Sequence, residues 1–377
     1  MTPIQHSIFA RAKRFFFGGL FVFCLALPTN GMGQDLTAYT TPRGHFYAFY
    51  KGQAIQLSHL EPASFKIAKN YLVYTSNSGS LMLYQPSRVS EPGEIAISAK
   101  RINVSEGYLA FEVHGQLRLY ANNKLRTLST SFQKWEAADS TVCWFDNTRK
   151  QLLIFQNNKT KELEDALLNE PILNFEVADN LVAYTDNHHQ LLVYYKKEKH
   201  YLCQAYPPMH FKVAKNLVAF IDRSAGTFNL FYKGDIMELS AFRPLSYRTA
   251  DNRLAFVDNS GRFFLFDEGN LAELSSFAPD KYWLTDDLLV YFENREFVAH
   301  WKGESYNLES YMPDGIKVHK DAVCYLNDMQ QLVIFQDGKK EIISYDTPSS
   351  FYLHYNTVVY YKGNSMPHVY YKGSIYK

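Results

Sequence analysis

The stretch Phe211-Lys212-Val213-Ala214-Lys215-Asn216-Leu217-Val218-Ala219-Phe220 decides the fold of this 377-residue chain. It combines a short alternating strand, two turn residues and an apolar strand that ends in an aromatic residue. Nine aromatic residues close copies of this block: Tyr74, Phe111, Trp144, Tyr184, Phe220, Phe256, Tyr291, Tyr325 and Tyr360. The second residue of each block always stands eight positions earlier: Lys66, Asn103, Glu136, Glu176, Lys212, Arg248, Trp283, Lys317 and Tyr352. A constant offset within a repeat of about 36 residues predicts a repeat architecture.

Each repeat predicts four antiparallel strands. The two turn residues of the block, such as Asp251-Asn252, tolerate the positive φ that a two-residue hairpin requires. After the closing aromatic come a polar turn such as Asp258-Asn259-Ser260-Gly261, a third apolar strand, a tight turn such as Lys233-Gly234, and a fourth strand. The link to the next repeat often places an aromatic residue shortly before a proline, as in Phe242-Arg243-Pro244.

Four short strands per repeat with longer links between repeats resemble the blades of β-propeller repeat proteins, and the resemblance covers nearly all of the chain after residue 33. The Trp-Asp ending of WD repeats and the Ser-Pro-Asp-Gly turn of TolB-like propellers are absent, so no subfamily is indicated. The resemblance implies an all-β disc of about nine four-stranded blades around a central channel, whose faces and channel mouth bind ligands or partners. It does not separate enzymes from scaffolds.

The two ends of the chain complicate the blade count. Residues 46–57 and residues 369–376 both match the third and fourth strands of a repeat. We predict that these hairpins compete for one slot in the last blade, since pairing the two termini removes an open sheet edge. Nine blades is the first expectation, and eight with a detached terminal unit is the alternative. Residues 34–45 are expected to be flexible, and residues 46–377 to form one propeller domain.

The first 33 residues have the pattern of a secretory signal peptide. Arg11, Lys13 and Arg14 precede an apolar run at residues 15–28, and small residues flank a cut after Gly33. A membrane anchor is the rival interpretation, but this run is shorter than the roughly 20 residues that span a bilayer. Cys24 indicates a lipoprotein only weakly, because Phe23 precedes it. We expect export to the periplasm or the extracellular space, with no transmembrane segment after cleavage.

Composition excludes some classes of function. The chain has 39 basic and 38 acidic residues, and three of the basic ones fall in the signal, so the processed chain carries a net charge of −2. Such a chain lacks the basic excess of a general nucleic-acid binder. Of the cysteines after the signal, Cys143 and Cys324 precede closing aromatics and are expected to be buried, while Cys203 has no evident partner. No disulfide framework is expected.

The second residues of the blocks are the candidate ligand site. Alternation turns Phe211 and Val213 toward neighbouring blades, so Lys212 and its equivalents are expected to line the channel. Around the ring, Lys212, Arg248, Trp283, Lys317, Tyr352 and Lys66 then form a basic and aromatic arc that faces Glu136 and Glu176. We predict an anionic ligand at this arc. The alternative is a solvated channel whose charges balance.

Catalytic and metal motifs are scarce in the sequence. No nucleophile elbow, zinc-binding helix, phosphate loop or calcium loop occurs, and no cofactor is expected. His188-His189 is interpreted as a solvated turn. Residues 159–169 form an insertion whose composition favours helix, either as decoration or as a partner contact. The leading hypothesis is an exported, non-catalytic binding or scaffold protein for a protein, anionic or carbohydrate ligand. The alternative is a carbohydrate-active enzyme that uses Glu136 and Glu176 as paired carboxylates.

Overall fold

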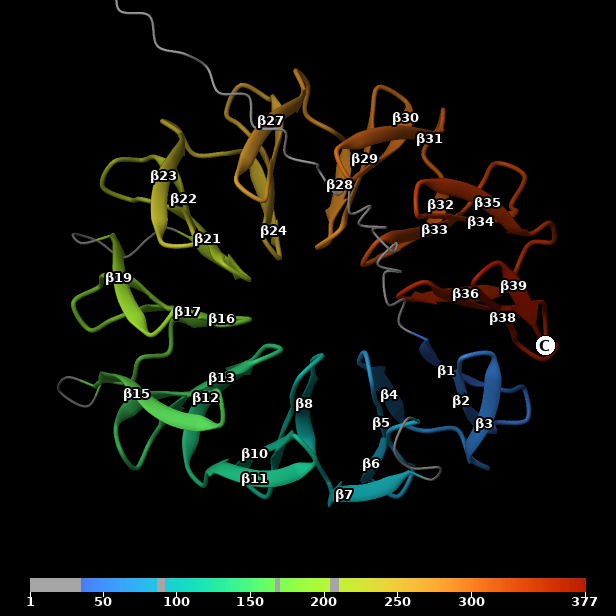
Figure 1. The fold of residues 1–377 in the computed structure, drawn as a ribbon, viewed down its shortest axis with the longest axis horizontal. Helices are drawn as coiled ribbons and strands as arrows, with labels where there is room; N and C mark the ends of the chain where they lie inside the picture. Colours follow the sequence, from blue (N-terminus) through green and yellow to red (C-terminus); the bar gives the residue numbers. More distant parts are fainter. Residues whose placement is uncertain (1–34, 87–91, 167–169, 204–209) are drawn as a thin grey trace, which may run out of the picture. The chain divides into compact units, whose positions relative to one another are not determined.

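The computed structural model describes residues 35–86, 92–166, 170–203 and 210–377. The strands of these residues form ten antiparallel sheets, nine with four strands and one with three. In Figure 1 the sheets of residues 35–377 stand as blades around a central opening. The all-β propeller prediction is therefore confirmed, while the predicted count of about nine blades, or eight, is wrong.

The blades follow one another in chain order. Blade 1 contains β1 (Leu36–Thr40), β2 (Phe46–Tyr50) and β3 (Gln53–Ser58). Blade 2 contains β4 (Ser64–Ile67), β5 (Leu72–Thr75), β6 (Ser80–Tyr84) and β7 (Gly93–Ile97). Blade 3 contains β8 (Lys100–Val104), β9 (Leu109–Val113), β10 (Gln116–Ala121) and β11 (Lys124–Ser129). Blade 4 contains β12 (Phe132–Ala137), β13 (Thr141–Asp146), β14 (Gln151–Gln156) and β15 (Lys159–Asp165). Blade 5 contains β16 (Phe175–Ala178), β17 (Leu181–Thr185), β18 (Leu191–Tyr195) and β19 (Glu198–Cys203).

The second half of the ring repeats the same order. Blade 6 contains β20 (Phe211–Ala214), β21 (Leu217–Ile221), β22 (Phe228–Tyr232) and β23 (Asp235–Ser240). Blade 7 contains β24 (Ser246–Ala250), β25 (Arg253–Val257), β26 (Phe263–Asp267) and β27 (Asn270–Ser275). Blade 8 contains β28 (Lys281–Leu284), β29 (Leu288–Glu293), β30 (Glu296–Trp301) and β31 (Glu304–Glu309). Blade 9 contains β32 (Asp314–His319), β33 (Ala322–Leu326), β34 (Leu332–Gln336) and β35 (Lys339–Ser344). Blade 10 contains β36 (Ser350–His354), β37 (Thr357–Tyr361), β38 (His368–Tyr371) and β39 (Ser374–Tyr376).

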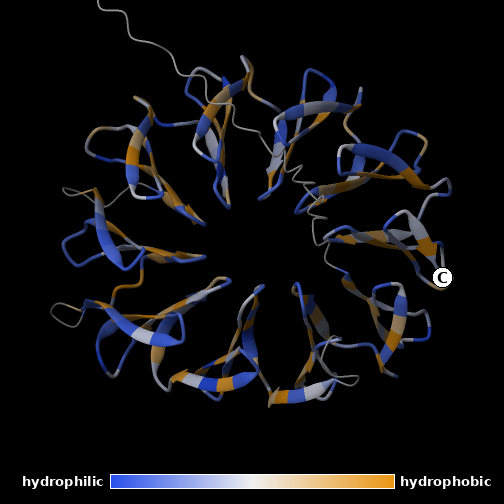
Figure 2. Cartoon of the chain, viewed as in Figure 1, coloured by the Kyte–Doolittle hydropathy of each residue, from blue (hydrophilic) through white to orange (hydrophobic). Residues whose placement is uncertain are grey.

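The core lies between the blades. In blade 6, every residue of the second and third strands, β21 and β22, is buried, because both faces of these strands pack against neighbouring sheets. The block residues Phe211, Val218 and Phe220 belong to one cluster with Leu191 and Val193 of blade 5. In Figure 2 the strands mix hydrophobic and hydrophilic residues, and most of the turns are hydrophilic. The repeated block therefore supplies the packing between blades.

Each end of the chain forms its own blade, so the predicted competition for one slot does not occur. Part of the segment expected to be flexible, residues 34–45, instead forms the buried strand β1. Tyr39 and Phe49 of blade 1 pack with Val359, Val369 and Tyr371 of blade 10. Two tyrosine hydroxyls of blade 10 add hydrogen bonds to β1: Tyr352 donates to Ala38 O at 2.8 Å and Tyr361 donates to Thr40 O at 2.9 Å. The ring thus closes by side-chain packing and hydrogen bonds between the three-stranded blade 1 and the four-stranded blade 10.

Blade 1 has no innermost strand among the described residues, since its first strand β1 corresponds to the second strand of the other blades. The innermost strands on either side of it meet directly. The rings of Phe65 in blade 2 and His354 in blade 10 are 6.3 Å apart. The channel is therefore lined by nine innermost strands, although the described chain has ten blades.

The two faces of the disc carry different connections. First and third turns lie on one face, here named the first-turn face; the backbone N–H of Lys233 in a third turn donates to Asn216 O in a first turn at 2.9 Å. Second turns and the links between blades lie on the other, here named the link face. There the hydroxyl of Tyr311 donates to the carboxylate of Asp328 at 3.3 Å.

Two further expectations concern single segments. The predicted helix at residues 159–169 is wrong where it is described, because Lys159–Asp165 forms the outermost strand β15 and pairs with β14. Its polar residues face solvent and Leu163 is buried, a pattern that suits an edge strand. The predicted signal peptide, residues 1–33, lies outside the described residues.

Candidate functional site

All the predicted channel residues lie on innermost strands, and most of them contact the next blade. Lys66 Nζ donates to Ile102 O (2.6 Å), Asn103 Nδ2 to Ala137 O (3.2 Å), Lys212 Nζ to Tyr247 O (3.5 Å), and Val213 N to Glu176 Oε2 (3.2 Å). An innermost strand is the channel-side edge of its sheet. The backbone N–H and C=O groups that point away from the sheet therefore have no neighbouring strand to pair with. The second residues of the block satisfy such groups and link successive blades.

The basic and aromatic arc has few unengaged head groups. The guanidinium of Arg248 lies 5.1 Å from the ring centre of Tyr282, an arrangement that stabilises the cation. Trp283 is half-buried and meets Phe297 edge-on. Lys317 is exposed and has no hydrogen bond or ion pair within the described ranges. An anionic ligand at this arc remains a prediction.

Glu136 and Glu176 lie at equivalent positions on the innermost strands β12 and β16 of neighbouring blades. Burial raises the pKa of Glu176, and the charge of Glu136 raises it further. Lys134 Nζ lies 2.9 Å from Glu136 Oε1 and also donates to Phe175 O at 2.7 Å. Glu136 lines a cavity of about 460 Å³ together with Trp135 and other residues of blades 3–5. Glu176 therefore has the raised pKa of a candidate general acid, but the carboxylate of Glu136 is neutralised by Lys134.

The first turns meet around a cavity of about 480 Å³ at one mouth of the channel. Its lining comes from the same positions of six consecutive blades, 4 to 9, which places it on the channel axis. The charged residues that line it are Asp139, Asp179, Asp251, Asp286 and Lys320. We name this site the channel mouth.

Hydrogen bonds between neighbouring turns hold the carboxylates in place. The backbone N–H of Glu106 donates to Asp139 Oδ1 at 2.8 Å, and the backbone N–H of Lys215 donates to Asp251 Oδ1 at 3.1 Å. The backbone N–H of Asp251 donates in turn to Asp286 Oδ1 at 3.1 Å. In the part of the chain that the structure describes, the second oxygens of Asp139 and Asp251 have no hydrogen-bond partner. Each of these two carboxylates is held in place through one oxygen, and its second oxygen can accept a hydrogen bond from a ligand.

Two lysines neutralise part of this charge. Lys215 Nζ lies 2.8 Å from Asp179 Oδ2, and Lys320 Nζ contacts both Asp286 and Glu106, the latter at 3.6 Å. With Glu106 included, five carboxylates stand against these two ammonium groups. The mouth therefore carries an acidic excess.

Burial and neighbouring charges shift the pKa values of the carboxylates at the channel mouth. Burial raises the pKa of Asp251 to about 6, and the nearby charge of Asp286 adds to the rise. Burial likewise raises the pKa of Asp139. Burial would also raise the pKa of Asp286, but the hydrogen bond from Lys320 and the charge of that lysine lower it overall. Asp251 is thus the carboxylate whose charge changes nearest to neutral pH.

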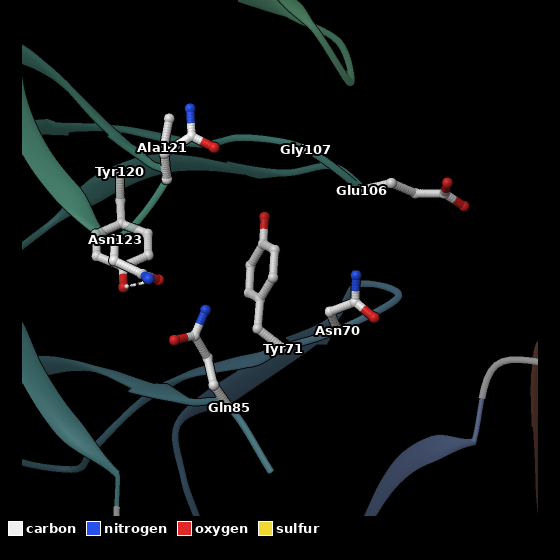
Figure 3. Close-up of a pocket in the computed structure, with 9 residues that line it drawn as sticks. Asn70, Tyr71, Gln85, Glu106, Gly107, Tyr120, Ala121 and Asn123 are labelled. Atoms are coloured by element: carbon white, nitrogen blue, oxygen red, sulfur yellow. Dashed lines mark hydrogen bonds between the residues drawn. The ribbon is translucent and has the colours of Figure 1, made fainter. Parts of the chain in front are cut away.

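The first turns of blades 3 and 4 pack closely at Gly107, and a cavity lies beside this contact. A Cβ at Gly107 would lie 2.0 Å from Asp139 O, so blades 3 and 4 can approach only with glycine there. On the other side of Gly107, a cavity of about 460 Å³ separates blades 2 and 3 (Figure 3). Figure 3 shows Tyr71 pointing toward the chain at Gly107; its hydroxyl donates to Ser105 O at 2.7 Å and Tyr108 O at 2.9 Å. The hydroxyl of Tyr71 thus joins blades 2 and 3 by hydrogen bonds.

Sequence reasoning missed the channel mouth because it assigned the first-turn residues to turn chemistry alone. The signal was the recurrence of acids and lysines at one position: Lys69, Glu106, Asp139, Asp179, Lys215, Asp251, Asp286 and Lys320. The acids of the second turns do follow turn chemistry. Asp258 Oδ1, for example, accepts from the backbone N–H of Ser260 and of Arg262, both at 2.9 Å.

Other site chemistry is limited in the described residues. Cys143 and Cys324 are buried, as their positions predicted, and Cys203 is buried as well; all three thiols are free. No group of three or more His, Cys, Asp or Glu residues in the described ranges is arranged to hold a metal ion. No helix in the same ranges has the length and apolar character of a membrane span.

The ring of four-stranded blades and its central mouth define a β-propeller. The chain belongs to the 10-bladed beta propeller domain family, whose model matches residues 31–376. The match agrees with the ten sheets of the structure.

Three solved structures are similar to this chain at low sequence identity. The computationally designed Ika8 protein is 13% identical, with a TM-score of 0.36 over 72% of this chain and 95% of its own. Hsv2p of Kluyveromyces lactis is 13% identical, with a TM-score of 0.35 over 75% and 99%. PorZ of Porphyromonas gingivalis, a bacterial surface component of the type-IX secretion system, is 10% identical, with a TM-score of 0.27 over 89% and 64%. Among curated proteins no match to this sequence was found.

Proposed function

We infer that this chain is an exported, non-catalytic binding or scaffold propeller that holds a cationic group of its ligand or partner at the channel mouth. The observation that carries the proposal is the concave site with an acidic excess on six consecutive blades. The unpartnered oxygens of Asp139 and Asp251 are acceptors for an ammonium or guanidinium group. Export to the periplasm or extracellular space rests on the signal-peptide pattern of residues 1–33.

A binding role fits the positions of the polar side chains better than a catalytic one. At the channel wall, Lys66, Lys212 and Glu176 are engaged by the next blade. The remaining free acceptors lie on rigid turns, which suits recognition of a group that enters from the first-turn face. The enzyme alternative rests on the raised pKa of Glu176 beside Glu136. Hydrolysis of a glycoside that Glu176→Gln abolishes would support that alternative.

The proposal is tested by thermal stabilisation of the purified chain with two probes of opposite charge, spermidine and citrate. We expect spermidine to raise the melting temperature, and Asp139→Asn with Asp251→Asn to remove this effect. A matched control replaces two exposed acids of the outermost strand β23, Asp235→Asn and Glu238→Gln, and keeps the effect. Stabilisation by citrate alone, lost in Lys212→Ala with Arg248→Ala, would contradict the proposal and support the basic arc.

A further inference from the structure

One position of the repeat fills the space between neighbouring blades on the first-turn face. It stands opposite the first residue after the first turn, and in five blades it is a large aromatic residue: Tyr50, Tyr195, Tyr232, Trp301 and Tyr371. The hydroxyl of Tyr195 donates to Asn216 Oδ1 of the next blade at 3.0 Å. Trp301 lies 3.1 Å from the Cβ position of Gly338, also in the next blade. The aromatic side chain at this position therefore reaches the following blade.

Blade 2 carries a glutamine at this position, and the space beside it stays open. Gln85 lines the cavity of about 460 Å³ between blades 2 and 3. It is half-buried, and its amide has no hydrogen-bond partner among the described residues. The glutamine at the same position of blade 4, Gln156, instead donates to Thr141 Oγ1 at 3.1 Å and to Asn180 Oδ1 at 3.3 Å. The amide of Gln85 can therefore bind a ligand with both its oxygen and its nitrogen.

The cavity has a neutral, polar lining. Four amide side chains line it: Asn70, Gln85, Asn122 and Asn123. Figure 3 shows Gln85 and Asn70 on either side of Tyr71, and all three point toward blade 3. Among the described lining residues only Glu106 is charged; it pairs with Lys320 at 3.6 Å, and in Figure 3 its carboxylate points away from the other side chains. The cavity thus offers amides but no unpaired charge.

The walls of the cavity are held in place before a ligand binds. The hydroxyl of Tyr71 is fixed by the backbone carbonyls of blade 3 described above. The hydroxyl of Tyr120 donates to Asn123 Oδ1 at 3.2 Å (Figure 3). Asn122 and Asn123 form a two-residue turn with φ of 50° and 59°, a left-handed conformation that asparagine tolerates. Because these groups are already ordered, binding costs little conformational entropy.

A sugar matches both the chemistry and the size of this cavity. A sugar hydroxyl both donates and accepts, so two adjacent hydroxyls can pair with the oxygen and the nitrogen of one amide. The C–H groups of a sugar ring can pack against tyrosine rings. The cavity volume falls within the range of about 300–1,000 Å³ that is typical of ligand pockets. We propose that the cavity between blades 2 and 3 binds an uncharged saccharide, whose hydroxyls are bound by the amides of Gln85 and Asn70.

Other classes of ligand fit the cavity less well. A charged ligand would find no counter-charge, because Glu106 is already paired. Peptides are bound along a free strand edge or in an apolar groove, whereas this cavity lies among turns and amides. Its lining residues differ from those of the cavity at the channel mouth. The saccharide site is therefore additional to the cation site and does not depend on it.

The proposal is tested by saturation-transfer NMR of the purified chain with four uncharged disaccharides: maltose, lactose, mannobiose and N,N′-diacetylchitobiose. We expect saturation transfer to at least one of them, and NMR titration then gives its affinity. Gln85→Leu removes the free amide, and we expect a roughly fivefold or greater loss of affinity. Gln85→Tyr introduces the residue type that other blades carry at this position, so it should fill the cavity and abolish binding.

Matched variants in blade 9 make the test specific. Gln336 holds the same position of the repeat there, so Gln336→Leu and Gln336→Tyr should bind the sugar like the unaltered chain. Circular dichroism of the Gln85 variants should match that of the unaltered chain. The proposal is overturned if none of the four disaccharides binds, if Gln85→Leu and Gln85→Tyr both keep full affinity, or if the Gln336 controls lose affinity as strongly. Stronger saturation transfer to triglycine than to any of the sugars would assign the cavity to a peptide and also overturn the proposal.

Discussion

Lys320 Nζ lies 3.6 Å from Glu106 Oε1, although these residues belong to blades 9 and 3 and three blades stand between them. The ion pair is possible because blade 1 contributes no innermost strand among the described residues, so Phe65 and His354 meet and the channel wall is shortened. Lys320 also contacts Asp286 of blade 8. One lysine thus connects three blades across the mouth.

Replacing Lys320 by methionine should destabilise the ring in a pH-dependent way. The variant leaves Asp286 and Glu106 without their cation, and we expect a loss of about 1–3 kcal/mol in the free energy of unfolding at pH 7.5. Because Asp286 loses the group that lowers its pKa, the loss should shrink at pH 5, where the carboxylate takes up a proton more readily. Urea unfolding of the variant and of Lys339→Met, an exposed control, measures both values. Equal losses for the two variants would show that Lys320 has no special role.

Gly107→Ala should lower stability without changing any charge. The new Cβ would meet Asp139 O at 2.0 Å, so the first turns of blades 3 and 4 must separate. We expect a loss of about 1–3 kcal/mol. Gly93→Ala is the matched control, because no atom lies within 4 Å of its Cβ position. If calorimetry gives both variants the same melting temperature, the turns are not closely packed.

Removing residues 369–377 should be as harmful as removing residues 34–58. The first deletion takes away all of β38 except His368 and the whole of β39, including Val369 and Tyr371 of the closing cluster, and the second removes Tyr39 and Phe49 from the same cluster. Each deletion exposes a whole interblade surface, so we expect a fall in melting temperature of more than about 10 °C. A small effect of the first deletion alone would restore the idea that the N-terminal hairpin can fill the last blade.

The extent of correct prediction follows from what the repeated block encodes. Its alternation and apolar runs act locally and between adjacent blades, so the strand order and the burial of residues such as Phe220 and Cys324 followed from the sequence. The predicted number of blades is wrong because one repeat was not counted. Leu36-Thr37-Ala38-Tyr39 also ends in a closing aromatic, but the first half of this block falls within the segment assigned to the signal peptide. The tenth blade was therefore overlooked.

The candidate site was harder to predict, because its chemistry depends on contacts between blades. Lys66 and Lys212 lie on innermost strands, but the alternation of side chains carries no information on whether a neighbouring strand binds the head group. The first-turn acids appeared to be ordinary turn residues. Their assembly into one mouth follows only from ring closure, which brings Glu106 and Asp286 to the same lysine.

Stability should depend on the protonation of Asp251. Its pKa in the folded chain, about 6, lies above its ordinary value of 3.8, so the folded state holds the proton more tightly than the unfolded state does. The resulting contribution is fully present below about pH 4 and is lost as pH rises to about 6. Asp251→Asn cannot ionise, so between pH 4.5 and 7.5 it should lose about 1–2 kcal/mol less stability than the unaltered chain. If urea unfolding shows that the unaltered chain and Asp251→Asn lose the same stability between the two pH values, the raised pKa of Asp251 is disproved.

The central claim, a cationic group held at the channel mouth, is tested most directly by calorimetric titration of spermidine at pH 7.5 and pH 5. Asp251 is ionised at the higher pH and largely protonated at the lower, so affinity should fall as pH decreases through about 6. In the variant with Asp139→Asn and Asp251→Asn, heat of binding should be lost at both pH values. Binding of equal affinity at the two pH values, or binding retained by the variant, would contradict a cation site at the channel mouth.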